Sequence, residues 1–99
     1  MKIEEYLNKF TNKNYDLSLK EFFITEEALN KGITVEEEIK HQESTFDGFL
    51  LDVDFTIIMF LMDIENTFNI KFIDYEVENI NSINDLIENV SLKIKNNTI

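Results

Sequence analysis

The sequence predicts an all-α fold, and three observations support this. The chain of 99 residues has no proline and only two glycines, Gly32 and Gly48, so the residues that usually separate short strands are nearly missing. Apolar residues recur three and four positions apart over long stretches. The length fits one small domain, and a hydrophobic fraction of 43% supplies a single core. We therefore expect residues 1–99 to fold as one helical domain.

Two helices are expected before Gly32. Ile3 to Phe10 places apolar side chains at helical spacing, and the polar stretch 12–15 looks like its end. Leu17 to Lys31 predicts a second helix, either continuous or broken at Thr25. Gly32 then stands where a left-handed residue commonly ends a helix.

A capping box follows directly. The Thr34 hydroxyl is placed to accept the Glu37 amide while the Glu37 side chain reaches back to Thr34. This pattern predicts a short acidic helix through His41, with Glu36, Glu37 and Glu38 on a solvated face. Residues 43–53 are expected to form a loop.

Asp54 to Thr67 has the strongest helical pattern in the chain. Asp52 or Asp54 is the natural N-cap, since a carboxylate accepts free amides and meets the positive end of the helix dipole. One apolar face is predicted to hold Phe55, Ile58 and Met62, together with Ile64 or Phe68.

The C-terminal part predicts two more helices. Residues 70–72 are expected to be extended, and Asp74 to Asn79 suits a short helix. Ser82 to Asp85 is a second capping box, with Asp in the place of Glu, and it opens a final helix to about Lys95. The tail 96–99 is expected to fray.

The charge balance points to a class of partner. Twenty acids oppose nine lysines, which gives a net charge of −11, and no base stands between His41 and Ile70. Such a field repels nucleic acid and anionic membranes and favours a basic protein surface as the partner. The chain has no cysteine, its first residues are acidic where a signal peptide is basic, and it lacks a membrane-length apolar run. We expect a cytoplasmic protein.

Nothing in the sequence indicates catalysis. His41 is the only histidine, and no serine or cysteine arrangement surrounds it, so we expect it to be solvated. Asp47, Asp52 and Asp54 lack the alternating oxygen ligands and the glycine of a calcium loop. We therefore expect no enzyme activity, no metal site and no cofactor.

One stretch carries a resemblance to a known family. Residues 50–55 read Leu-Leu-Asp-Val-Asp-Phe and lead into an apolar run that ends at Phe68. Together with its flanks, the region from Phe46 to Val90 resembles an acyl carrier protein. Residues 74–83 resemble the short third helix of that family and the turn after it, and residues 3–7 resemble its first helix. On this reading about 14–44 is an insertion.

The resemblance implies a four-helix bundle with a long loop after its first helix. Members of the family carry phosphopantetheine on a serine in an Asp-Ser-Leu triplet, and they dock on basic partners through acids along the second helix. Here the triplet reads Val53-Asp54-Phe55, so the hydroxyl that carries the cargo is absent. Asp54 is either simply a helix cap or a mimic of the phosphate charge of a loaded carrier.

The candidate docking surface is altered as well. Thr56 and Met59 stand where the family usually has acids, and the helix is apolar over most of its circumference. Either the insertion covers this helix within the monomer, or Ile57, Met59 and Leu61 form an interface with a second copy or another protein. The partner-binding residues predicted from sequence are Asp52, Asp54, Thr56, Ile57, Met59, Asp63 and Glu65.

Two functions from different classes remain open at this point. The first is an acyl-carrier-like protein that lacks the attachment serine and acts as an acidic protein-binding module. The second is an acidic inhibitor of the immunity or antitoxin type, which blocks a basic toxin.

Overall fold

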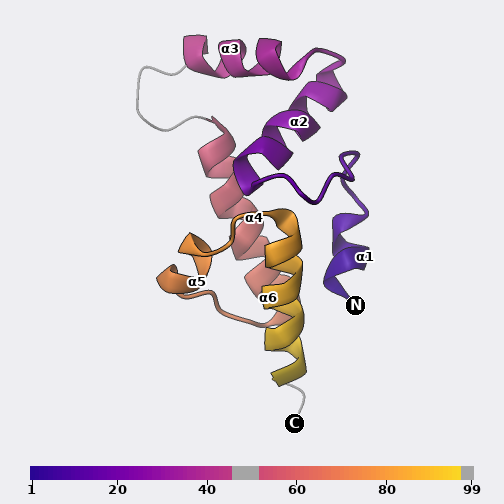
Figure 1. Ribbon diagram of the computed structural model, residues 1–99, viewed down its shortest axis with the longest axis vertical. Helices are drawn as coiled ribbons and strands as arrows, with labels where there is room; N and C mark the ends of the chain where they lie inside the picture. The colour runs from indigo at the N-terminus through magenta and orange to yellow at the C-terminus, as the bar shows by residue number, and fades with distance from the viewer. Residues whose placement is uncertain (46–51, 97–99) are drawn as a thin grey trace.

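The computed structural model describes residues 1–45 and 52–96, and over these residues the chain is helical with no β-strand. Figure 1 shows the arrangement of the helices. The expected all-α class is confirmed. The helices are α1 (Ile3–Leu7), α2 (Leu19–Lys31), α3 (Val35–Thr45), α4 (Asp52–Phe68), α5 (Asp74–Glu78) and α6 (Ile83–Asn96).

The long helix α4 occupies the middle of the molecule (Figure 1). Helix α2 packs against the N-terminal part of α4 and against α3, whereas α1 packs against α6. Helix α3 lies across the end opposite the C-terminus, and the molecule is elongated, with extents of 48 × 26 × 20 Å. The predicted insertion therefore supplies two helices, α2 and α3, which gather at one end of α4.

Aromatic rings fill the junction of α1, α2 and α4. The rings of Phe23 and Phe60 lie 4.7 Å apart, and Phe10 makes edge contacts with Phe22, Phe23 and Phe60. Tilted and edge-to-face ring pairs of this kind add to the stabilisation from burial alone. The buried apolar core comprises Ile3, Tyr6, Leu7, Leu19, Phe22, Phe23, Ile24, Val53, Phe60, Ile64, Ile70, Ile83, Leu86 and Val90.

The predicted helix signals around Gly32 are confirmed. Gly32 ends α2 with φ of 70°, and its N–H donates to the carbonyl oxygens of Ala28 and Leu29. The Glu37 N–H donates to the Thr34 hydroxyl at 3.1 Å, and the Thr34 N–H donates to the Glu37 carboxylate at 3.2 Å. Both halves of the capping box are therefore present.

Several predicted boundaries were wrong. Helix α1 ends at Leu7, because the chain then turns and the Phe10 N–H donates to the Leu7 carbonyl. Helix α2 begins at Leu19, because the Ser18 hydroxyl caps it by accepting from the Glu21 N–H. It then runs unbroken through Thr25, which is one of the two expected possibilities.

Helix α3 continues past His41 to Thr45, and α4 already begins at Asp52. The expected loop over 43–53 is therefore helical at both ends, and its middle, residues 46–51, lies outside the described residues. Because α4 begins at Asp52, neither Asp52 nor Asp54 is its N-cap; both lie in the first turn.

The C-terminal helices are close to expectation. Helix α5 ends one residue early, and α6 runs through Asn96, while the rest of the predicted frayed tail, 97–99, lies outside the described residues. The Asp85 N–H donates to the Ser82 hydroxyl at 3.2 Å, but the Asp85 carboxylate accepts from the Asn81 N–H. In the second capping box, the bond from the Asp85 side chain therefore reaches the N–H of Asn81, one residue before Ser82.

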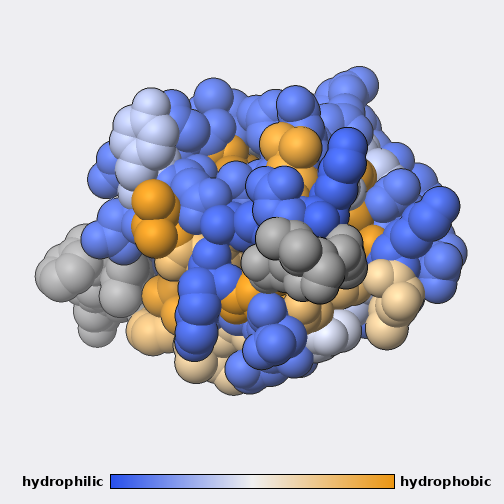
Figure 2. Space-filling view, turned by 90° about the horizontal axis from the view of Figure 1, so that it is seen from below, coloured by the Kyte–Doolittle hydropathy of each residue, from blue (hydrophilic) through white to orange (hydrophobic). Residues whose placement is uncertain are grey.

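Seen from the end where the C-terminus lies, most of the surface is hydrophilic, with apolar side chains visible between the polar ones (Figure 2). Within residues 1–45 and 52–96, none of the helices combines the length and apolarity needed to cross a bilayer.

Candidate protein-binding site

Helix α4 presents a continuous apolar stripe to solvent. Phe55, Ile58, Met59 and Met62 are 48%, 49%, 64% and 50% exposed. Their spacing of three, one and three residues places them on one side of the helix. We call these four residues the stripe. Large apolar side chains gathered on one exposed helix face are typical of interaction surfaces, whereas single ones are ordinary.

The stripe corrects the predicted buried face. The sequence placed Phe55, Ile58 and Met62 on one apolar face with Ile64 or Phe68, but only the last two point inward. Ile64 is fully buried and Phe68 partly buried, and they lie on the opposite side of the helix from the stripe. The buried and partly buried face of α4 consists of Val53, Ile57, Phe60, Leu61, Ile64 and Phe68.

The same geometry divides the predicted apolar interface. Met59 belongs to the stripe, whereas Ile57 and Leu61 are partly buried and pack against the core. The two expected explanations for an apolar α4 concern different faces of the helix. Helix α2 covers the face that contains Phe60, and the stripe stays exposed.

Three of the four predicted acids have partners within the chain. Asp54 pairs with Lys20 of α2 at 3.9 Å. Asp63 pairs with Lys9 at 3.6 Å and accepts a hydrogen bond from the Tyr6 hydroxyl. These pairs tie α4 to the two helices beside it.

Burial and the hydrogen bond to Asp63 raise the pKa of Tyr6 well above its ordinary value. Glu65 has a structural task too: its carboxylate accepts the Phe72 N–H at 2.8 Å and fixes the chain beyond α4. Asp52 and Thr56 are exposed, and the Thr56 hydroxyl donates to the Asp52 carbonyl oxygen at 3.1 Å.

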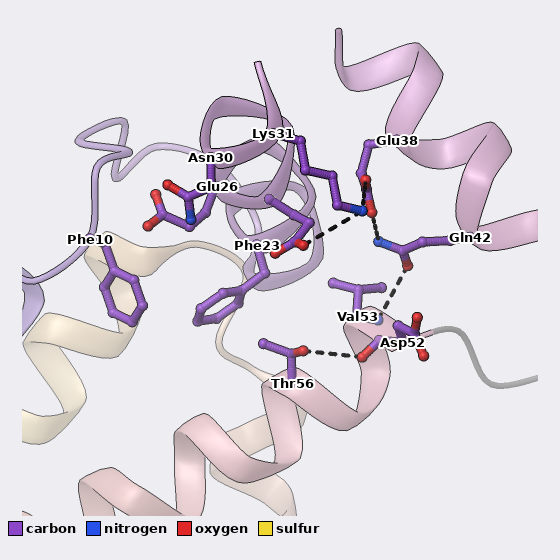
Figure 3. A pocket seen from close by; sticks show the side chains of 11 residues that line it. Phe10, Phe23, Glu26, Asn30, Lys31, Glu38, Gln42, Asp52, Val53 and Thr56 are labelled. Atoms are coloured by element: carbon purple, nitrogen blue, oxygen red, sulfur yellow. Dashed lines mark hydrogen bonds and ion pairs between the residues drawn. The ribbon is translucent and has the colours of Figure 1, made fainter. Parts of the chain in front are cut away.

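A buried chain of hydrogen bonds joins α2, α3 and the start of α4 (Figure 3). Lys31 Nζ donates to Glu38 at 2.8 Å, Gln42 Nε2 donates to the other oxygen of Glu38 at 2.7 Å, and the Val53 N–H donates to Gln42 Oε1 at 3.2 Å. The Val53 amide lies in the first turn of α4, where amides have no partner within the helix. Gln42 therefore caps α4 from a different helix.

Glu38 was expected on a solvated face, and this was wrong, since the residue is only 1% exposed. Burial by itself would raise the pKa of the Glu38 carboxyl. The hydrogen bonds from Lys31 and Gln42 outweigh burial and hold that pKa below its ordinary value. The hydrogen bond to Glu38 likewise raises the pKa of Lys31.

Two hollows flank the start of α4. One, of about 330 Å³, lies between α2, α3 and α4, with Phe10 and Phe23 on one side and the Glu38–Gln42 chain on the other (Figure 3). The second, of about 320 Å³, lies between α1 and α4 and brings together Thr56, Met59 and Asp63. Three of the residues predicted from sequence thus share one hollow.

Sequence reasoning missed Glu38, Gln42, Ile58 and Met62 as parts of this region. A signal for Glu38 was present: Lys31 precedes it by seven residues across a predicted helix–turn–helix. No comparable signal identified Gln42. His41, next to it, is exposed as expected.

Asp54 occupies the third residue of α4, and its carboxylate faces Lys20. Among the described residues, no group of three or more histidine, cysteine or acidic side chains is arranged to hold a metal ion.

Comparisons with known proteins found no match: no protein-family model, no curated protein and no solved structure matches the chain.

Proposed function

We propose that this chain is an acyl-carrier-like protein without a carrier serine, and that it acts as a non-enzymatic, acidic protein-binding module in the cytoplasm. The observation that carries the proposal is the stripe on α4, the helix that corresponds to the docking helix of the family. The order of a short first helix, a long α4, a short α5 and a final α6 supports the carrier-like bundle, with α2 and α3 as its insertion.

The chemistry of residue 54 argues for docking without loading. Attachment of phosphopantetheine needs a hydroxyl that becomes a phosphodiester oxygen, whereas a carboxylate at residue 54 would give a labile acyl phosphate. In this structure the Asp54 carboxylate lies 3.9 Å from Lys20 Nζ, and this ion pair joins α2 to the first turn of α4. This contact supports a structural role for Asp54 rather than the phosphate-mimic role.

Charge favours a basic protein over a second copy of this chain. Between His41 and Ile70 the chain has six acids and no base, and Asp52 and Asp63 flank the stripe. Two copies of α4 packed through their stripes would bring acids against acids.

The test is a pull-down from the native cell with the tagged chain at low and moderate salt, followed by mass spectrometry of the bound proteins. Recovery of acyl-, peptide- or polyketide-building enzymes would support the proposal. Recovery of a single basic toxin would replace it with the inhibitor function, and recovery of only the untagged native copy of the chain would indicate a homodimer.

A further inference from the structure

The two hollows beside α4 form one groove. Both are lined by Phe10, Phe23 and Thr56, so they meet at these residues. The first hollow lies under α2 and α3, and the second continues along α4 past Met59 and Phe60. We call the first the acidic pocket and the second the apolar channel. The groove runs beside the stripe, on the side of α4 that faces α1 and α2.

The acidic pocket combines aromatic and carboxylate walls (Figure 3). Phe10 and Phe23 lie on one side of it. Among the described residues that line it, the acids are Glu26, Glu27, Glu38 and Asp52, and the one base is Lys31.

The single lysine does not neutralise these acids. Lys31 Nζ is shared between Glu38 at 2.8 Å and Glu27 at 3.6 Å. The Glu26 carboxylate accepts the N–H groups of Thr11 and Asn12 at 3.0 and 2.7 Å, and neither bond removes its charge. A concave, negatively charged site with aromatic walls concentrates the field that attracts a cation.

The size of the pocket limits the ligand. A volume of about 330 Å³ is at the lower end of ligand pockets, which suits one side chain rather than a drug-sized molecule. A guanidinium is planar, weakly hydrated and stacks on aromatic faces, which an ammonium does less well.

We propose that the acidic pocket accepts an arginine side chain of the protein partner, with a neighbouring apolar side chain of the same segment in the apolar channel. The inference rests on the proposed function, since the ligand is part of a bound protein. The occupant is not a second copy, because this chain contains no arginine.

The test is an NMR titration of the ¹⁵N-labelled full chain with N-acetyl-leucyl-arginine amide. N-acetyl-leucyl-citrulline amide serves as the neutral probe of the same shape, and the lysine analogue serves as the ammonium probe. We expect saturable shifts at amides that line the groove, including those of Asn30, Gln42 and Thr56. We also expect at least fivefold weaker binding of the citrulline probe and weaker binding of the lysine probe.

Two variants distinguish binding in the acidic pocket from a general effect of net charge. Thr56→Arg places a competing guanidinium where the two hollows meet and makes the net charge one unit more positive. Glu78→Gln makes the same change in net charge on α5, at a residue that does not line the groove. Thr56→Arg is expected to weaken arginine binding at least fivefold, and Glu78→Gln less than twofold.

Equal binding of arginine and citrulline, shifts spread over α5 and α6, or equal effects of the two variants would overturn the proposal. Lysine binding as tight as arginine would overturn the guanidinium assignment. Ile58 and Met62 of the stripe do not line the groove, so changes there test the proposed function separately. If a stripe variant loses the partner while the arginine probe does not bind, the proposed function stands and this inference falls.

Discussion

Gln42 of α3 accepts a hydrogen bond from the Val53 N–H of α4, with 3.2 Å between Oε1 and N. The Nε2 atom of the same Gln42 side chain donates to one carboxylate oxygen of Glu38. The other oxygen of Glu38 accepts from Lys31 Nζ. One buried side chain therefore connects α2 and α3 to the first turn of the helix that bears the stripe. This connection adds to the core packing of Phe60 and Ile64 in holding α4 against α2 and α3.

Gln42→Ala is expected to lower the free energy of unfolding by about 1–3 kcal/mol, because the Val53 amide and one oxygen of Glu38 lose their buried partner. Urea denaturation measures the change. Glu43→Ala, at an exposed position of the same helix, is the control and should change it by less than about 0.5 kcal/mol. Equal effects of the two variants would show that the cap contributes nothing.

Phe60 and Phe55 lie on opposite faces of α4, and their truncation should differ sharply. Phe60→Ala removes a ring from the aromatic junction and is expected to cost about 3–5 kcal/mol. Phe55 is 48% exposed, so Phe55→Ala should cost less than about 1 kcal/mol. Thermal unfolding of both variants measures the difference, and a large loss with Phe55→Ala would contradict the orientation of α4.

Gly32→Ala tests the left-handed end of α2. A Cβ at this position would have no atom of residues 1–45 or 52–96 within 4 Å, so the cost is conformational and not steric crowding by these neighbours. At φ of 70° it should be about 1 kcal/mol or slightly more. Gly32→Asn should cost less, because asparagine adopts this conformation more readily. Urea denaturation compares the two, and an unchanged midpoint for Gly32→Ala would be evidence against this helix end.

Glu76 gives the protein a specific pH dependence. The hydrogen bond from Lys93, at 2.7 Å between Nζ and Oε2, and then the backbone N–H of Ile73 lower the pKa of Glu76 to about 2. The pKa of this carboxyl is thus lower in the folded than in the unfolded chain. Its stabilisation is complete above the unfolded value, about 4.3, and is lost as the pH falls through about 2.

Glu76→Gln should therefore cost about 1 kcal/mol at pH 7 and progressively less below pH 4. Urea denaturation of both proteins at a series of pH values measures this convergence. A difference that stays constant down to pH 2 would show that ionisation of Glu76 is not its cause.

The helix signals that sequence reasoning used best were local. The Thr34–Glu37 capping box and the left-handed Gly32 each depend on residues within one turn, and both are present in the structure. The orientation of α4 could not be predicted in this way. Apolar residues surround most of that helix, so periodicity alone does not decide whether Ile57 or Ile58 points inward. The decision comes from α2, whose Phe23 packs on Phe60.

The burial of Glu38 could not be predicted from the sequence for a related reason. Three glutamates in succession on a predicted helix look like a solvated face, and the one turned inward depends on where α2 and α4 lie. Helix α4 ends at Phe68, one residue after the predicted Thr67, and Asn69 follows it. Asparagine tolerates the positive φ of 54° found there, and the Ile70 N–H closes the end on the Glu65 carbonyl.

The central claim is that the stripe binds a protein partner, and partner retention by three forms of the tagged chain tests it most directly. The forms are the wild type, Ile58→Gln/Met62→Gln, and the matched control Leu29→Gln/Leu92→Gln, which changes two half-exposed apolar residues outside α4. None of the substitutions alters the net charge. We predict at least tenfold less partner on the stripe variant and unchanged retention on the control. Equal retention by all three forms would contradict the account.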